Sequence, residues 1–360
     1  MPGERFFRGS VARPLALGAV VGGVVLAAFI LATGRPAARI DAPAPAKEPE
    51  APPRAPDPPP ATGGTSPSLS ARALVERARE KVKRGDHEGV IADSTKAIEL
   101  DPTLAVAWTQ RGVARGDMGD VDGEVTDCTR AIELDPRLAL AWASRGVGRL
   151  QKDDWDGAIA DLTKAIELDP TLAPAWTSRG VARGKKGDWE GDIADCTKAI
   201  EIKPSFANAW GSRGVAREHR GDQDGAFADY SKAVELDPKL PSAWMNRGIA
   251  RGNKGDWEGQ IADCTKAIEL NPKVVVAWAA RGAARGTTGD LDGAIADLTK
   301  AIELEPRHAS AWMNRGGALA GKGDEAGAIR DFTKALELDP TGPNAARVRQ
   351  MLVQLRERAR

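Results

Sequence analysis

The sequence predicts an all-α protein built from stacked helical repeats, and three observations lead to this prediction. A ten-residue segment recurs with few changes, as DLTKAIELDP at 161–170 and DLTKAIELEP at 297–306. Proline and tryptophan landmarks recur at a constant interval of 34 residues. Each interval contains two helical hydrophobic patterns separated by a turn. The landmarks are Pro102, Pro136, Pro170, Pro204, Pro238, Pro272, Pro306 and Pro340, with Trp108, Trp142, Trp176, Trp210, Trp244, Trp278 and Trp312.

The repeat array occupies most of the chain. Leu74 stands 34 residues before Trp108 and begins an eighth copy, so eight units without insertion are expected over 71–342. The flanking segments, 1–70 and 343–360, are too short for a second folded domain of ordinary size. The expected units are 71–104, 105–138, 139–172, 173–206, 207–240, 241–274, 275–308 and 309–342.

Local signals predict where the helices of a unit end and begin. In the third unit, the helix that contains Trp142 should end near Asp153, and a second helix should run from about Trp155 to Asp169. A glycine stands at the turn of the other seven units, where a helix C-terminus needs a left-handed residue, and Asp153 takes this place here. The next residue is aspartate in every unit, which predicts an N-cap worth about 1 kcal/mol. The glycines are Gly85, Gly119, Gly187, Gly221, Gly255, Gly289 and Gly323, and the aspartates are Asp86, Asp120, Asp154, Asp188, Asp222, Asp256, Asp290 and Asp324.

These landmarks resemble the tetratricopeptide repeat family. The third unit has an aromatic residue near its start (Trp142), a glycine four residues on (Gly146), small residues in the second helix (Ala158 and Ala165) and a closing Pro170. The resemblance covers about three quarters of the chain. It implies a right-handed superhelical solenoid with a concave groove lined by first helices, which holds peptides or partner proteins and performs no chemistry of its own.

The chain departs from the family pattern at the small residue that opens the second helix. Glu124, Asp192 and Gln260 replace the residue equivalent to Ala158, and we expect them to loosen those units locally.

Two arginines recur in the first helices, and two interpretations of them stay open. They lie four residues apart on one helical face, which could bind phosphate or nucleic acid. Alternatively, an aspartate that recurs in each second helix pairs with one of them and ties the unit together. The first series is Arg77, Arg111, Arg145, Arg179, Arg213, Arg247, Arg281 and Arg315, and the second is Arg115, Arg149, Arg183, Arg217, Arg251 and Arg285. The aspartates are Asp93, Asp127, Asp161, Asp195, Asp229, Asp263, Asp297 and Asp331.

The charge balance and the scarcity of reactive groups exclude several classes of function. Lys plus Arg is 51 and Asp plus Glu is 51, so no excess of basic charge drives nucleic-acid binding, and no nucleic-acid partner is expected. His87, His219 and His308 lie in different units without a second ligand nearby, so we expect no metal site. No phosphate loop or nucleophile motif is present, which predicts neither a cofactor nor a catalytic residue, and the protein is not expected to be an enzyme.

The cysteines and tryptophans are interpreted mainly as packing residues. Cys128, Cys196 and Cys264 occupy one equivalent core position and are expected to be buried free thiols. The seven regularly spaced tryptophans are expected to anchor helices. Three further tryptophans open second helices at a position where other units carry Gln or Glu, so they are expected to be partly exposed and could contact a ligand. These are Trp155, Trp189 and Trp257.

The resemblance also implies which side chains line the groove, namely those one and five residues after the tryptophan. They are Thr109, Val113, Ala143, Val147, Thr177, Val181, Gly211, Val215, Met245, Ile249, Ala279, Ala283, Met313 and Gly317. The strip is small and weakly apolar, and it lacks the Lys and Asn pattern with which chaperone-docking relatives clamp a terminal carboxylate. An extended peptide or an amphipathic helix of a partner protein is the expected occupant, and shielding of the interior is the alternative. The rival function is a solute binder that takes a glycan or an anionic ligand.

The N-terminal segment predicts a membrane anchor. A short basic segment, 1–14, precedes twenty uncharged residues at 15–34, enough to cross about 30 Å of hydrocarbon as a helix. A secretory signal usually has a shorter apolar region and a small-residue cleavage site, so an uncleaved single-pass helix is favoured over a cleaved signal. The basic head predicts repeats on the extracytoplasmic side of the cytoplasmic (plasma) membrane. Gly18 and Gly22 form a GxxxG spacing that could support a homodimer.

The two segments next to the array have simpler expectations. The Pro/Ala-rich stretch 35–70 cannot form regular structure and should be a disordered, semi-rigid spacer that reaches on the order of 100 Å. The segment 343–360 should form one capping helix over the last unit. Its covering residues are Val348, Met351, Leu352 and Leu355.

Overall fold

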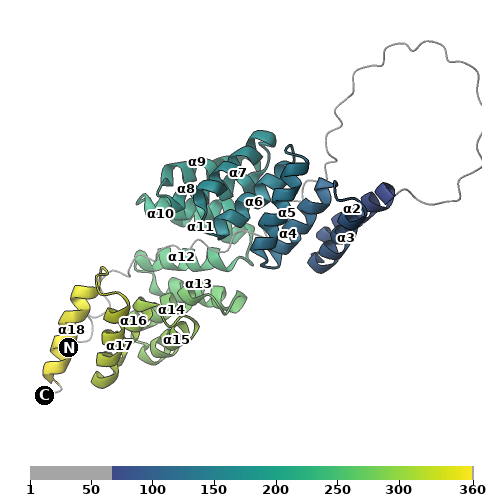
Figure 1. Ribbon diagram of the computed structural model, residues 1–360. Coiled ribbons are helices and arrows are strands. Elements are labelled where there is room, and N and C mark those ends of the chain that lie inside the picture. Colours follow the sequence, from purple (N-terminus) through teal and green to yellow (C-terminus); the bar gives the residue numbers. More distant parts are fainter. Residues whose placement is uncertain (1–66, 359–360) are drawn as a thin grey trace, which may run out of the picture. The chain divides into compact units, whose positions relative to one another are not determined.

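The computed structural model describes residues 67–358, and every regular element in this range is an α-helix (Figure 1). The described chain forms two compact units, which divide between Lys186 and Gly187. The first unit is a stack of antiparallel helical hairpins: α2 (Pro67–Lys83), α3 (His87–Leu100), α4 (Ala105–Asp117), α5 (Val121–Leu134), α6 (Ala139–Gln151), α7 (Trp155–Leu168) and α8 (Ala173–Lys185).

The second unit continues the same alternation of first and second helices and ends on one additional helix. Its elements are α9 (Trp189–Ile202), α10 (Ala207–His219), α11 (Gln223–Leu236), α12 (Pro241–Asn253), α13 (Trp257–Leu270), α14 (Val275–Thr288), α15 (Leu291–Leu304), α16 (Ala309–Gly321), α17 (Glu325–Leu338) and α18 (Ala345–Arg358).

The predicted turn and cap chemistry is confirmed throughout the array. All seven turn glycines have positive φ angles, and Asp153 adopts φ 59° in the remaining repeat. The aspartate that follows caps the second helix, as when the Asp154 side chain accepts a hydrogen bond of 3.0 Å from the Gly157 amide. These bonds satisfy amide groups that a helix N-terminus leaves without an intrahelical partner.

Helix α2 begins earlier than expected. The spacer was predicted to extend to residue 70, but α2 starts at Pro67, so the prediction is wrong for its last four residues. Proline suits the first turn of a helix because its φ angle is already helical and its missing N–H would have no partner there.

The core is built from repeated contacts between neighbouring helices. In the third repeat, Leu162 and Ala158 of α7 are fully buried and pack with Val113 of α4 and Ala143 of α6. At the C-terminus, α18 buries Val348, Leu352 and Leu355 against Phe332 of α17. Each hairpin therefore depends on its neighbour for a closed apolar core, and α18 closes the last one.

Two N-terminal predictions lie outside the described residues. These are the membrane span at 15–34, with its Gly18 and Gly22 contact, and the spacer up to residue 66. No helix within residues 67–358 has the length and apolarity needed to cross a bilayer. The right-handed sense of the superhelix stays a prediction.

Candidate partner-binding surface

Asp161 of α7 shows how the two recurring arginines of a repeat are used. Arg145 of α6 donates from Nε and Nη2 to the two carboxylate oxygens, each at 2.8 Å. Arg149, one turn further along α6, places Nη1 2.9 Å from Oδ2 of the same carboxylate. The Asp161 side chain is only 3% exposed. Both arginines therefore pair with the aspartate, which confirms the structural interpretation and engages both guanidinium groups inside the repeat.

The same arrangement recurs along the array. The first arginine contacts both oxygens of the aspartate in the pairs Arg77–Asp93, Arg111–Asp127, Arg213–Asp229, Arg247–Asp263, Arg281–Asp297 and Arg315–Asp331. A second cation joins in Arg115–Asp127, Arg217–Asp229, Arg251–Asp263, Arg285–Asp297 and Lys81–Asp93. The hydrogen bond from Arg77 holds the pKa of Asp93 below its ordinary value, with Lys81 adding to the effect.

The capping aspartates complete the neutralisation of these charges. Nε of Arg149 lies 3.7 Å from Oδ2 of Asp154, the N-cap of α7. Arg145, Arg149, Asp154 and Asp161 together carry two positive and two negative charges. In this repeat the four groups therefore form a neutral internal network, which is unsuited to capture an anion.

The regularly spaced tryptophans are packing anchors, as expected. Trp142 donates from Nε1 to the carbonyl oxygen of Pro136 at 2.9 Å, and the guanidinium carbon of Arg145 lies 4.8 Å from the centre of its ring. Arg145 also donates to Oγ1 of Thr129 in the preceding repeat at 3.4 Å. The tryptophan–proline bond recurs from Trp108 to Trp312 at 2.9–3.0 Å. Each landmark thus fixes the junction between two repeats.

The structure divides the predicted groove residues into a buried and a partly exposed set. The buried members are Thr109, Val113, Ala143, Val147, Thr177, Ile249, Ala279, Ala283 and Gly317. The partly exposed members are Val181, Gly211, Val215, Met245 and Met313. Burial follows from direct packing between neighbouring first helices such as α4 and α6. That either set binds a partner stays a prediction. The partly exposed set is the one whose residues still have solvent-accessible surface that a partner could contact.

Helices α10 and α12 contain three of the partly exposed members. A Cβ atom added at Gly211 of α10 would meet no other atom within 4 Å, so the space in front of this backbone is open. Val215 of α10 packs beside Tyr230, and Met245 of α12 packs beside Ile249, while each keeps part of its surface in solvent. Gly211, Val215 and Met245 are called the patch below, because they are small or apolar, keep some exposed surface and hold predicted groove positions on the successive first helices α10 and α12.

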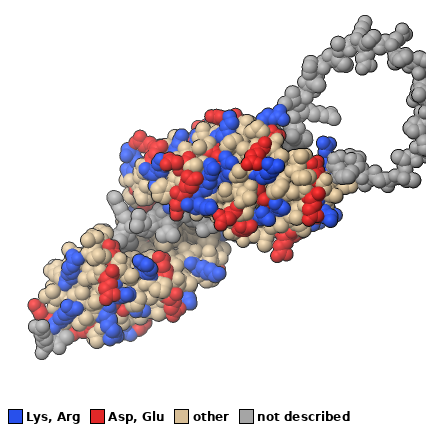
Figure 2. All heavy atoms as spheres, in the orientation of Figure 1, with Lys and Arg blue, Asp and Glu red and all other residues tan. Residues whose placement is uncertain are grey.

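The surface charges are mixed in sign. On the face that Figure 2 shows, Lys and Arg are interspersed with Asp and Glu, without a large area of one sign. Several of these charges pair between consecutive repeats, as Lys152 does with Asp122 and Lys254 with Asp224, both at 2.6 Å. Such a surface gives no electrostatic preference for a polyanion.

Three repeats bury a polar group where the others have a small one. Glu124, Asp192 and Gln260 have exposed fractions of 2%, 3% and 1%. The expected loosening of these units is absent from the helices themselves, because α5, α9 and α13 are as long as α7. Burial raises the pKa of Glu124 to about 8 and that of Asp192 to about 7.

Sequence reasoning missed Asp117, whose carboxyl group lies beside Glu124. Its side chain is 3% exposed, and burial raises its pKa to about 7. Comparison of the repeats would have singled it out, because the equivalent residue is an acid in no other unit.

The remaining reactive residues are accounted for within the described chain. Cys128, Cys196 and Cys264 are free and buried, as predicted. Residues 67–358 contain no cluster of three or more His, Cys, Asp or Glu side chains that could hold a metal ion. Trp189 stacks on His219 with ring centres 3.9 Å apart, so this partly exposed tryptophan already has an aromatic neighbour.

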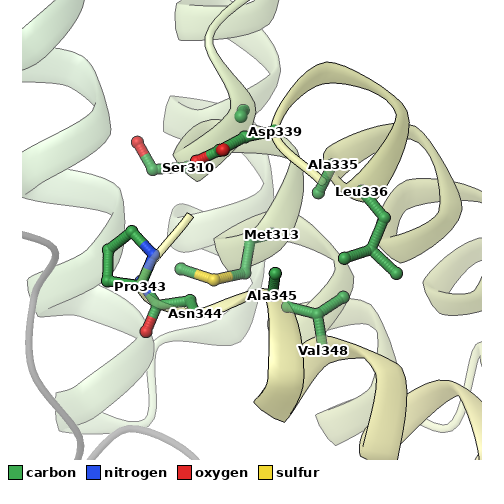
Figure 3. Close-up of a pocket in the computed structure, with 10 residues that line it drawn as sticks. Ser310, Met313, Ala335, Leu336, Asp339, Pro343, Asn344, Ala345 and Val348 are labelled. Atoms are coloured by element: carbon green, nitrogen blue, oxygen red, sulfur yellow. The ribbon is translucent and has the colours of Figure 1, made fainter. Parts of the chain in front are cut away.

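A small cavity lies where α16, α17 and α18 meet (Figure 3). Met313, Leu336, Pro343 and Val348 are among its lining residues, and its volume is about 60 Å³. Pockets for drug-sized ligands start at roughly 300 Å³, so this cavity is too small for such a molecule. It belongs to the packing of the capping helix.

Comparison with known proteins agrees with this architecture. A tetratricopeptide repeat family model matches residues 280–343, and a TPR repeat model matches residues 219–255. A search of curated proteins found no match. Together with the repeat geometry, these matches support a tetratricopeptide repeat protein.

Solved structures share the fold at low sequence identity. A chain of the APC/C hetero-tetramer Cut9–Hcn1 aligns with a TM-score of 0.66 at 20% identity, over 78% of this chain and 55% of that one. A tetratricopeptide repeat protein from Parabacteroides merdae aligns with a TM-score of 0.53 at 15% identity, over 70% of this chain and 99% of that one. PilF of Pseudomonas aeruginosa aligns with a TM-score of 0.50 at 13% identity, over 59% and 97%. The likeness concerns the fold alone, and this chain spans little more than half of the Cut9–Hcn1 chain.

Proposed function

We propose that this protein is a membrane-anchored scaffold that binds a partner protein or peptide on the exposed face of its first helices. The observation that carries the proposal is the way in which the array uses its recurring residues. Within the described repeats, the recurring arginines and aspartates pair with each other and the arginines also lie over the regularly spaced tryptophans, so these groups are already engaged inside the array. The tetratricopeptide fold commonly mediates protein–protein interaction, which supports the same conclusion.

The patch at Gly211, Val215 and Met245 is the proposed contact point. It is apolar and partly exposed, and the open space in front of Gly211 leaves room for a bound chain. An amphipathic helix or an extended peptide could bury its apolar side chains there.

A substitution at Gly211 tests the proposal without disturbing the core. Gly211→Glu should fold normally, because the added atoms enter open space and a helical glycine is less favourable than most residues by roughly 0.5–1 kcal/mol. It should nevertheless reduce capture of the partner by the solubilised full chain, since it places a charge on the patch.

Met118→Glu is the matched control for that experiment. Met118 is 52% exposed and stands at the C-terminal end of α4, far along the chain from the patch. Circular dichroism should show that both variants fold. Loss of capture in Gly211→Glu alone supports the proposal. Equal capture by both variants and the wild-type chain contradicts binding at this patch.

The proposal includes anchoring through residues 15–34 in the cytoplasmic membrane, with the repeats on the extracytoplasmic side and a helix contact at Gly18 and Gly22. Protease protection in intact cells tests the orientation. Deletion of 15–34 should release the protein from membranes, and Gly18→Ile should reduce crosslinked dimers. Release of the wild-type chain by alkaline carbonate would contradict the anchor.

The solute-binding alternative now rests on the tryptophans that open second helices. Trp155, Trp189 and Trp257 are partly exposed, which is the feature that favours it. Quenching of tryptophan fluorescence by a glycan series, absent in a Trp155→Gln and Trp257→Gln double variant, would support this alternative. The paired arginines no longer offer a site for an anionic ligand.

A further inference from the structure

Gln260 shows how a neutral side chain is accommodated at the position of Glu124. Its amide nitrogen Nε2 donates a hydrogen bond of 2.9 Å to the carbonyl oxygen of Ala280, on the first helix of the next repeat. Ser144 of α6 occupies the place of Ala280 in the third repeat, next to Glu124. An ionised carboxylate accepts hydrogen bonds only, whereas a protonated carboxyl group can donate one as the Gln260 amide does.

The groups that face Glu124 bring no positive charge to it. From α4 comes the carboxyl group of Asp117, from α6 the hydroxyl group of Ser144, and Cys128 lies one turn along α5. Glu124 Oε2, Ser144 Oγ and both carboxyl oxygens of Asp117 are buried without a hydrogen-bond partner. From α3, His87 places Nδ1 3.3 Å from Asp117 Oδ2 and does not pair with Glu124.

The nearby arginines are bound elsewhere. Arg111 and Arg115 of α4 both contact Asp127, each at 2.8–2.9 Å. Arg145 of α6 binds both oxygens of Asp161. A carboxylate at position 124 would therefore be a buried negative charge beside a second acid, which is costly in a low-dielectric interior.

We propose that Glu124 is a neutral carboxylic acid in the folded chain, and that loss of its proton to solvent loosens the packing of α5 against α4 and α6. The junction of the second and third repeats is then a pH-sensitive element of the array. When α5 separates from α4 and α6, water reaches the Glu124 and Asp117 carboxylates together. This hydration removes the desolvation cost of an ionised carboxylate in the closed state.

The direction of the effect follows from the pKa shift. Burial, and after it the neighbouring Asp117, raise the pKa of Glu124 to about 8. Between the ordinary pKa of a glutamate and this raised value, the closed state binds more protons than the opened state. The closed state is therefore favoured at the acidic end of this window and loses stability as pH rises. From pH 6 to pH 8 the opening equilibrium should increase about tenfold or more through Glu124.

The buried cysteines provide matched reporters of local opening. Cys128 lies one turn from Glu124, and Cys264 holds the same place beside Gln260. A full chain with Cys196→Ser and Cys264→Ser retains only the Cys128 thiol. A full chain with Cys128→Ser and Cys196→Ser retains only the Cys264 thiol. Serine is accommodated at this position, because Ser94 occupies it in the first repeat. The measurement is the rate of modification by a disulfide reagent from pH 6 to pH 8, corrected for the ionisation of a free thiol.

The corrected rate at Cys128 should rise about tenfold or more over this range, while that at Cys264 stays nearly constant. Glu124→Gln should abolish the rise. Gln260→Glu should create one at Cys264, which keeps the proposal testable if the first variant folds poorly. Parallel rates at the two thiols overturn the proposal. So does a rise at Cys128 that persists in Glu124→Gln, or a Cys128 that stays unreactive at both pH values.

Discussion

The Asp161 carboxylate accepts hydrogen bonds from Arg145 and pairs with Arg149 while almost fully buried. Removal of one member from such a cluster leaves uncompensated charge in the interior, which is far more costly than the loss of an exposed pair. At the scale of single residues, the high cost of losing one partner is a physical reason why the buried aspartate and its arginine partner recur together from repeat to repeat.

Asp161→Asn should destabilise the protein by about 3 kcal/mol, because two guanidinium groups would lose their shared counter-charge. Urea unfolding followed by tryptophan fluorescence measures the change. Lys164→Gln is the control, since Lys164 and Glu167 form an exposed pair on the same helix whose loss should cost less than about 0.5 kcal/mol. Equal changes in the free energy of unfolding for the two substitutions would contradict the structural role of the Arg–Asp cluster.

Residue-level prediction from sequence worked where the signal is local. The φ angle of Asp153 and the cap at Asp154 follow from the turn pattern alone. The sharing of Asp161 by two arginines could not be read in this way, because it depends on the distance between two helices. The same limit applies to Glu124, whose burial is set by α4 and α6 together with its own helix.

At the scale of helices, two core positions on the second helix vary together. Ala158 is followed one turn later by Leu162, whereas Glu124 is followed by the smaller Cys128, and all four side chains are buried. The repeats with Asp192 and Gln260 also carry cysteine at the later position. A larger first residue thus accompanies a smaller second one, which keeps the volume between neighbouring helices nearly constant.

A double-mutant cycle at Glu124 and Cys128 tests this exchange of volume. Cys128→Leu alone should cost about 1–3 kcal/mol through overpacking, because Cys128 Sγ already lies where Gly112 leaves room for it. The combination with Glu124→Ala recreates the pair of the third repeat and should recover at least about 1 kcal/mol of that loss. Urea unfolding at pH 6 gives the energies.

The control cycle combines Glu124→Ala with Cys264→Leu, which lie in different compact units. Distant sites should be additive within about 0.5 kcal/mol. A coupling energy near zero for the adjacent pair as well would show that the two positions vary independently.

The groove illustrates what helix-level prediction could not supply. Spacing predicts that Val113 and Ala143 line the groove on successive first helices, and the structure buries both in one core cluster. Gly211 and Met245 occupy the position equivalent to Ala143, directly after the tryptophan, and keep exposed surface. Closeness of packing between neighbouring helices is a tertiary property, so equivalent sequence positions differ in accessibility.

At the scale of the whole molecule, the recurring arginines, aspartates and tryptophans of the described repeats are used for cohesion, and the face in Figure 2 carries charges of both signs. Specific recognition on such a surface depends on shape and on apolar contact more than on long-range attraction. The partly exposed patch at Gly211, Val215 and Met245 offers this kind of contact.

Site-specific photocrosslinking tests this central claim most directly. A photoreactive amino acid would replace Gly211 in the full chain, and a parallel variant would carry it at Glu235, an exposed residue on the second helix of the same repeat. We expect a discrete crosslinked partner from position 211 and none from position 235, with the product lost when Met245→Glu is added. The same product from both positions, or one that is insensitive to Met245→Glu, would contradict binding on the first-helix face.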